Sequence, residues 1–147
     1  MGYGYRDLMS YPYDGVDLRE HPEEYRIGRG EQGVFHAEPY KGELLPVWRF
    51  KNEEAARESS EAIYQKFLGY RSEGDFVGMD VARKYLQMGW TRSLRYAKYK
   101  GGNKTRPLEV PDQEKLRCAS IFKTLYDRVR TDDRYTEMKQ EHRRRNE

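Results

Sequence analysis

Cysteine is nearly absent from this sequence of 147 residues, and Cys118 is the only one. A single cysteine excludes an intrachain disulfide and a zinc site built from cysteines. Long apolar runs are also missing. Nowhere do 18 apolar residues follow one another, and the first 15 residues contain no segment apolar enough for a secretory signal peptide. We therefore expect a cytoplasmic protein without a membrane partner.

Residues typical of catalytic or metal sites are equally scarce. The three histidines, His21, His36 and His142, are scattered, and none has a second ligand at the spacing of a zinc site. His36 and Glu38 would point to one side of a strand, which leaves an acid–base pair as an alternative. Cys118 lies on an apolar helix face, where a thiol packs like a small hydrophobic side chain. The sequence thus predicts no catalytic residue, no metal site and no cofactor, and favours a protein that is not an enzyme.

Acidic residues are absent between Val81 and Leu108, although the whole chain holds 25 of them. The basic residues of this stretch are Arg83, Lys84, Arg92, Arg95, Lys98, Lys100, Lys104 and Arg106. We call these eight residues the basic stripe, and Trp90, Tyr96 and Tyr99 are interleaved with them. Like charges repel unless an anion lies against them, and aromatic faces can stack on bases, so the pattern predicts a nucleic-acid partner. Each aromatic side chain could instead pack in the core.

Charge is sorted along the rest of the chain as well. Residues 1–80 hold ten Lys or Arg against sixteen Asp or Glu, whereas residues 109–147 hold ten against nine. An acidic first half and a basic stripe give a dipolar field that orients the protein toward a polyanion. The alternative is that the acidic half folds back on the stripe and neutralises it from within.

The composition favours a folded domain despite its polarity. Apolar residues make up only 36% of the chain, but 14% of residues are aromatic and bring enough buried area for a core. We predict one globular domain at 17–142, an extended N-terminal arm at 1–16 and a charged tail at 143–147. The predicted fold class is α+β and predominantly helical, with short strands or a hairpin within 24–50 packed on about four helices.

The four helices are expected after residue 50. Their candidate N-caps are Asn52, Asp80, Thr91 and Asp112. The middle two, 81–88 and 92–100, are predicted to be separate helices because Gly89 stands between them. Two helices joined at a glycine resemble a helix-turn-helix, with Arg92 and Arg95 where base-reading side chains lie, but the joint matches that motif loosely.

Residues 28–33 read Gly-Arg-Gly-Glu-Gln-Gly, which is the spacing of a phosphate-binding loop. In a dinucleotide-binding fold this loop opens a helix, whereas here Val34 and Phe35 indicate a strand. We therefore interpret the segment first as a hairpin turn that needs glycine dihedral angles. The alternative is a phosphate site formed by Arg26, Gly28, Arg29, Gly30 and Gly33.

Several longer segments resemble a known family. They are GRGEQGVF (28–35), EPYK (38–41), LLPVWRF (44–50), ARESSE (56–61), DFVGMDVARKYLQMG (75–89) and TRSLRYA (91–97). Over roughly 17–142 the chain resembles the domain-of-unknown-function family 4385, small uncharacterised proteins of bacteria, archaea, fungi and viruses including phages. The resemblance implies one self-contained cytoplasmic domain, located in the host cytoplasm for a viral member. It implies no activity and no site residues.

The residues together predict binding of nucleic acid through the basic stripe, with phosphate contacts, aromatic stacking and little sequence specificity. Two alternatives stay open. One is an enzyme or sensor for a small phosphorylated ligand such as a nucleotide, held by the glycine segment and by arginines. The other is a structural subunit of a viral or cellular assembly, with a protein partner or a second copy of the chain.

Overall fold

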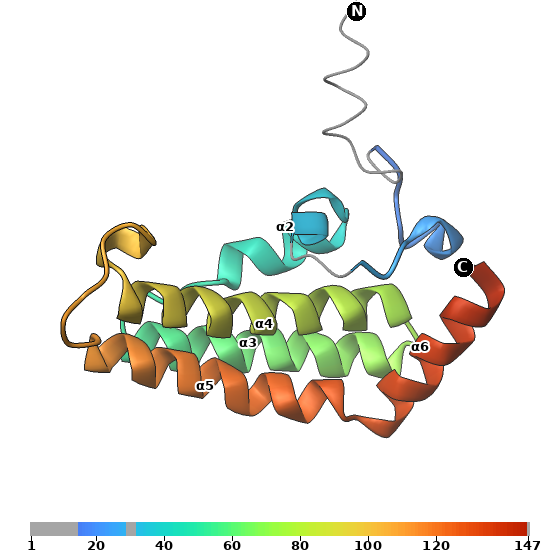
Figure 1. Cartoon of the computed structure of the whole chain (residues 1–147). Coiled ribbons are helices and arrows are strands. Elements are labelled where there is room, and N and C mark those ends of the chain that lie inside the picture. The colour runs from blue at the N-terminus through green and yellow to red at the C-terminus, as the bar shows by residue number, and fades with distance from the viewer. Residues whose placement is uncertain (1–14, 29–31, 147) are drawn as a thin grey trace, which may run out of the picture.

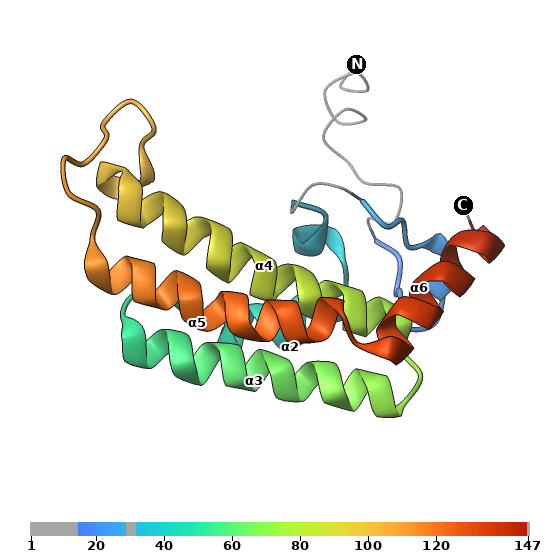
Figure 2. The same ribbon diagram turned by 60° about the horizontal axis from the view of Figure 1, so that its bottom comes forward.

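The computed structural model describes residues 15–28 and 32–146. The α-helices in this part of the chain are α2 (Tyr40–Leu44), α3 (Glu53–Ser72), α4 (Phe76–Lys98), α5 (Gln113–Arg130) and α6 (Asp133–Asn146). The long helices α3, α4 and α5 lie side by side, and α6 turns away from the end of α5 (Figures 1 and 2). Because α4 contacts each of the other four, it is the central element of the fold.

The side chains at the helix beginnings explain where α3, α4 and α5 start. Asn52 Oδ1 accepts a hydrogen bond from the Ala55 amide at 2.8 Å, and Asp112 Oδ1 accepts one from the Lys115 amide at 3.1 Å. Both predicted caps are therefore confirmed. Asp75, rather than Asp80, caps α4. Its Oδ1 accepts from the third amide of the helix at 3.0 Å, so α4 begins five residues earlier than the sequence suggested.

The prediction of two separate helices at 81–88 and 92–100 is wrong, because α4 is continuous through both. Gly89 does not end a helix; it lies where α4 meets α5. A Cβ built on Gly89 would lie 2.2 Å from the ring of Phe122 on α5, closer than any side chain can approach. Thr91 is an interior residue of α4. The missing side chain at residue 89 thus serves close helix packing rather than a turn.

The predicted strands or hairpin within 24–50 are also not observed, because no strand occurs among the described residues. This stretch instead contains α2 and short 3₁₀ helices. The 3₁₀ helices of the described chain are Pro22–Glu24, Gln32–His36, Leu45–Val47 and Lys100–Gly102. Tyr25, Val34 and Leu44 are each buried, but they enter the core one at a time from separate turns. The backbone hydrogen bonds of these turns are local, as in other 3₁₀ helices. The alternation of buried and exposed side chains that marks a strand is therefore not required here.

Both ends of the predicted domain at 17–142 contribute buried side chains to the fold. Of the predicted arm at 1–16, residues 1–14 lie outside the described residues. Leu18 is fully buried, and its amide donates to the Glu38 carbonyl at 2.9 Å. At the other end, α6 continues through 143–146 and buries Tyr135 and His142. None of the described helices combines the length and the apolar content that a bilayer crossing requires.

Candidate nucleic-acid interface

The first two cations of the basic stripe, Arg83 and Lys84, are buried in the structure. The carboxylate of Asp80, which is itself fully buried, accepts a hydrogen bond from Arg83 Nε at 2.9 Å. The hydroxyls of Tyr25 and Tyr135 donate to the same carboxylate, both at 2.5 Å. Burial alone would raise the pKa of Asp80, but the charges of Arg83 and Lys84 lower it to about 2. These two cations therefore belong to an internal ionic cluster.

In the middle of the stripe, Arg92 and Trp90 pack against aromatic side chains from other parts of the chain. The guanidinium of Arg92 lies 5.4 Å from the ring centroid of Trp48 and 5.7 Å from that of Phe35. Trp90 stacks on Tyr126 of α5, with centroids 5.6 Å apart and planes 24° from parallel. For Trp90 the geometry favours packing between helices over stacking on a base.

The last four cations of the stripe are exposed: Lys98, Lys100, Lys104 and Arg106. We call these four residues the basic end. They lie at the end of α4 and in the loop that follows, and Figures 1 and 2 show that loop at the end of the bundle opposite α6. Within the described parts of the chain, none of the four side chains forms an ion pair. Their charges are therefore open to solvent and to an external anion.

Hydrogen bonds hold the loop of the basic end in one conformation. The Lys100 amide donates to the Arg106 carbonyl at 2.8 Å, and the Leu108 amide donates to the Lys98 carbonyl at 2.9 Å. Arg95 Nε reaches the Gly102 carbonyl at 2.5 Å. Gly101 and Gly102 adopt positive φ angles of 57° and 74°, which residues with side chains rarely adopt. A loop ordered in this way loses little conformational entropy when it binds a ligand.

Tyr99 is half-buried and helps to close the same loop, because an isolated β-bridge pairs it with Pro107. Tyr96, in the last turn of α4, is in contrast 40% exposed. Its ring lies against the backbone of the loop: a Cβ built on Gly102 would be 3.0 Å from it. Tyr96 is thus close to the loop on one side while another part of the residue faces solvent.

A pocket of about 430 Å³ opens beside Tyr96. Its lining residues are Arg49, Phe50, Lys51, Tyr96 and Lys115. They come from the stretch before α3, from α4 and from α5, and no carboxylate is among them. The rings of Phe50 and Tyr96 have centroids 6.2 Å apart and planes inclined by 35°.

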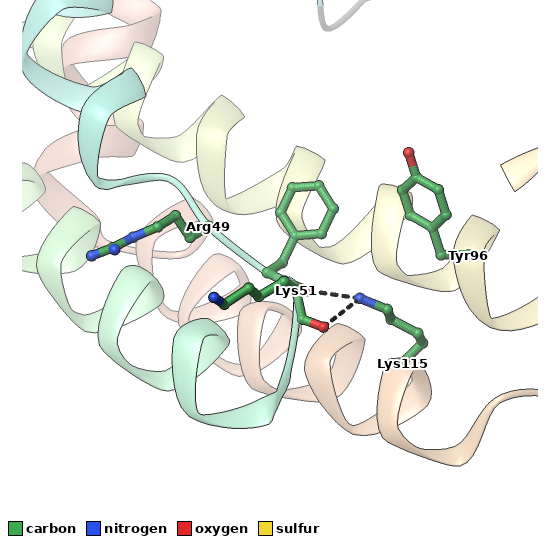
Figure 3. A pocket seen from close by; sticks show the side chains of 5 residues that line it. Arg49, Lys51, Tyr96 and Lys115 are labelled. Carbon is green, nitrogen blue, oxygen red and sulfur yellow. Dashed lines mark hydrogen bonds between the residues drawn. The ribbon is translucent and has the colours of Figure 1, made fainter. Parts of the chain in front are cut away.

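The cations of this pocket approach it from two sides. Lys115 Nζ donates to the carbonyls of Phe50 and Lys51 at 3.0 and 2.9 Å (dashed lines in Figure 3) and lies 5.9 Å from the Tyr96 ring centroid. Figure 3 shows the side chains of Arg49 and Lys51 extending to the opposite side, away from Tyr96. The Arg49 amide donates to Ser59 Oγ at 2.9 Å, which ties this stretch to α3. The pocket therefore combines two aromatic rings with three cationic residues.

Sequence reasoning did not find Arg49, Lys51 or Lys115 as site residues. They stand from 47 residues before Tyr96 to 19 residues after it in the chain, and acidic residues lie close to Lys51 and Lys115 in the sequence. Only the packing of α3 and α5 on α4 brings them to Tyr96. The sequence did not indicate these three residues, because the run of basic residues that defined the stripe ends before residue 108.

The alternative phosphate site around 28–33 stays a prediction. Arg29 and Gly30 lie outside the described residues, and Gly33 is buried. Arg26 is exposed, and its guanidinium reaches the Glu23 and Asn146 carbonyls at 3.5 Å. Gly28 lies near the buried stripe residue Lys84, whose Nζ would be 3.8 Å from an added Cβ.

The surroundings of Glu38 and Cys118 give no support to a catalytic role for either residue. Glu38 Oε1 accepts a hydrogen bond from the Gly42 amide at 3.0 Å, in the first turn of α2. Cys118 is fully buried, and this burial raises the pKa of its thiol, which disfavours the reactive thiolate. In residues 15–28 and 32–146, no group of three or more His, Cys, Asp or Glu side chains is placed to hold a metal ion.

Comparison with known proteins gives a family but no activity. The model of the family described as domain of unknown function DUF4385 matches residues 9–145, nearly the whole chain. The chain belongs to this family. A comparison with curated proteins found no match, and neither did a comparison with solved structures. Since the description of DUF4385 names no function, the functional argument rests on the geometry of the basic end and its pocket.

Proposed function

We propose that this DUF4385 protein binds nucleic acid through the basic end, with little dependence on sequence. One observation carries the proposal: four exposed cations stand at the end of α4 and on the ordered loop that follows, and none is paired with a carboxylate of the described chain. Phosphates would supply the missing negative charge. Contacts from Lys and Arg to phosphates position a nucleic acid but do not read its bases, which accounts for the low specificity.

The proposal divides the basic stripe into two parts with different roles. The buried Arg83 and Lys84 stabilise the fold through Asp80. Arg95 supports the loop by its bond to the Gly102 carbonyl, and Arg92 packs on aromatic rings. Binding is assigned to the exposed residues of the basic end, which is a narrower surface than the whole stripe.

The test is binding of labelled nucleic acid across a salt series, measured by fluorescence anisotropy. Each phosphate contact contributes about 0.7 to 0.9 to the slope of log affinity against log salt. Replacing Lys98, Lys100 and Lys104 together with Gln is therefore expected to weaken binding for unrelated sequences alike and to reduce this slope by about 2 to 3.

A matched control removes the same charge elsewhere. Lys66 on α3 and Arg134 and Arg143 on α6 are exposed and lie outside the basic end. Their triple replacement by Gln should leave the slope nearly unchanged. The proposal is wrong if the wild-type chain binds neither single strands nor duplexes at low salt, or if the control variant loses as much affinity as the test variant.

A further inference from the structure

We infer that the pocket beside Tyr96 receives one unpaired base of a single-stranded nucleic acid. The inference rests on the proposed function, because the basic end must first hold the phosphates of the strand. It goes further because it names a single strand, rather than a duplex, as the ligand. Tyr96 and Phe50 would contact the base, and Arg49, Lys51 and Lys115 are the other residues that line the pocket.

The aromatic surface of the pocket suits a flat, uncharged ring. Tyr96 and Val110 are the large apolar side chains that stand exposed in the described part of the chain, and exposing an aromatic ring to water is unfavourable. One side of the Tyr96 ring lies close to the loop at Gly102, where an added Cβ would be 3.0 Å from it. The pocket volume of about 430 Å³ falls in the range of small-ligand sites, roughly 300–1,000 Å³. A base stacked there would cover the exposed part of Tyr96.

The two rings of the pocket form a single surface rather than a clamp. Their centroids are 6.2 Å apart and their planes are inclined by 35°, so no third ring fits between them in parallel. A base would therefore stack on one side only, with Phe50 closing the edge. Stacking of this kind tolerates any base, because every base has a π face.

The charge around the pocket identifies an anionic chain rather than a neutral aromatic compound. Three of the five lining residues are cationic and none is acidic. Lys115 uses two N–H groups on backbone carbonyls and keeps a third donor, since an ammonium carries three. The pocket and the basic end both adjoin the last turn of α4, so the phosphates on either side of a base bound at Tyr96 could reach cations of both.

The requirement for an unpaired base follows from access. In a duplex the faces of each base are covered by its stacked neighbours, so a protein ring reaches a base face only in single strands, loops or ends. The pocket therefore predicts that single strands bind more tightly than duplexes of equal length.

The experiment compares two single strands that differ only in their bases. One is a short labelled oligothymidylate, and the other is an abasic phosphodiester of the same length. The wild-type chain is expected to bind the oligothymidylate about fivefold or more tightly, which is the lower range for one stacked base. Tyr96→Leu should bring this ratio close to one without changing affinity for the abasic strand. Tyr96→Phe, which keeps the ring, should preserve the ratio.

The matched control is Tyr64→Leu on α3. Tyr64 also has a cation beside its ring, with Arg128 Cζ 5.4 Å from the centroid, but it lies outside the pocket. This variant should retain the wild-type ratio. Circular dichroism of each variant verifies that the helices are intact.

The outcomes separate this inference from the proposed function. Equal affinity for both strands in the wild-type chain, or a ratio that survives Tyr96→Leu, overturns the base pocket and leaves phosphate binding standing. Displacement of the oligothymidylate by a mononucleotide at similar concentration also overturns it, since the pocket would then be a nucleotide site. Binding of duplexes without binding of either single strand overturns the base pocket alone. Absence of binding to single strands and duplexes alike at low salt overturns the proposed function itself.

Discussion

Asp80 is the carboxylate that balances the two buried cations of the basic stripe, Arg83 and Lys84. Its carboxylate receives Arg83 and the hydroxyls of Tyr25 and Tyr135, so it joins α4 to the N-terminal segment and to α6. A carboxylate buried among cations stays ionised, and removing it leaves positive charge in the interior without compensation. Asp80 thus offsets the charge of Arg83 and Lys84 in the core, where Arg83 also donates to Gln87 Oε1 at 2.8 Å.

We therefore expect Asp80→Asn to lower the free energy of unfolding by about 3–5 kcal/mol, the usual loss when one partner of a buried ion pair is removed. Urea denaturation followed by circular dichroism measures it. Asp127→Asn is the matched control, because Asp127 also pairs with two cations, Lys123 and Arg130, but on the surface. A loss in the control as large as in Asp80→Asn would contradict the assignment.

The lowered pKa of Asp80 also predicts a pH dependence. Its ordinary value is 3.8 and its value in the folded protein is about 2, so the folded state favours the ionised form. The resulting stability, about 2 kcal/mol, is fully present above pH 3.8 and is lost as the pH falls toward 2. Urea midpoints between pH 5 and pH 2.5 should fall more steeply for the wild-type chain than for Asp80→Asn. Parallel curves would argue against a buried, ionised Asp80.

The helices show how far the sequence can be interpreted without the structure. The caps Asn52 and Asp112 are confirmed, because capping depends on residues within one turn. The predicted helix end at Gly89 is wrong, because this glycine is required by its contact with Phe122, which lies 33 residues away in the sequence. The site divides in the same way. Tyr96 and the basic end were predicted from a local charge run, whereas Lys115 joins them only through the packing of α5 on α4.

Two glycines in helices provide an element-scale prediction. Gly→Ala within a helix ordinarily stabilises a protein by roughly 0.5–1 kcal/mol. Gly69→Ala in α3 should do so, because nothing lies within 4 Å of an added Cβ. Gly89→Ala should instead destabilise by roughly 1–3 kcal/mol, since its Cβ would overlap the Phe122 ring. Thermal or urea unfolding of both variants measures the difference, and a stabilised Gly89→Ala would refute the packing role.

At the scale of the whole molecule, the stabilising cluster and the proposed binding surface lie far apart. Asp80 is near the beginning of α4 and Lys98 is its last residue, which places them roughly 27 Å apart along the helix at 1.5 Å per residue. Sites at such a distance with no shared partners usually act independently.

Binding and stability should therefore respond to different substitutions. Under conditions where Asp80→Asn is still folded, it is expected to bind nucleic acid with the wild-type affinity and salt slope. The triple Gln variant at Lys98, Lys100 and Lys104 is expected to keep its free energy of unfolding within about 0.5 kcal/mol, as exposed substitutions usually do. Anisotropy and urea denaturation on both variants test this, and a loss of both properties in either variant would show that the two regions are coupled.

The two glycine contacts of α4 have a consequence for motion. Gly78 meets Tyr70 of α3, where an added Cβ would lie 2.5 Å from the ring, and Gly89 meets Phe122 of α5. Each ring is seated in a notch one residue wide, so neither neighbouring helix can slide along α4 without leaving its notch. We therefore expect these contacts to oppose shear between α4 and its neighbours. For a strand that binds at the basic end as proposed, we expect no rearrangement of α3, α4 and α5. The rate of association would then be set by encounter.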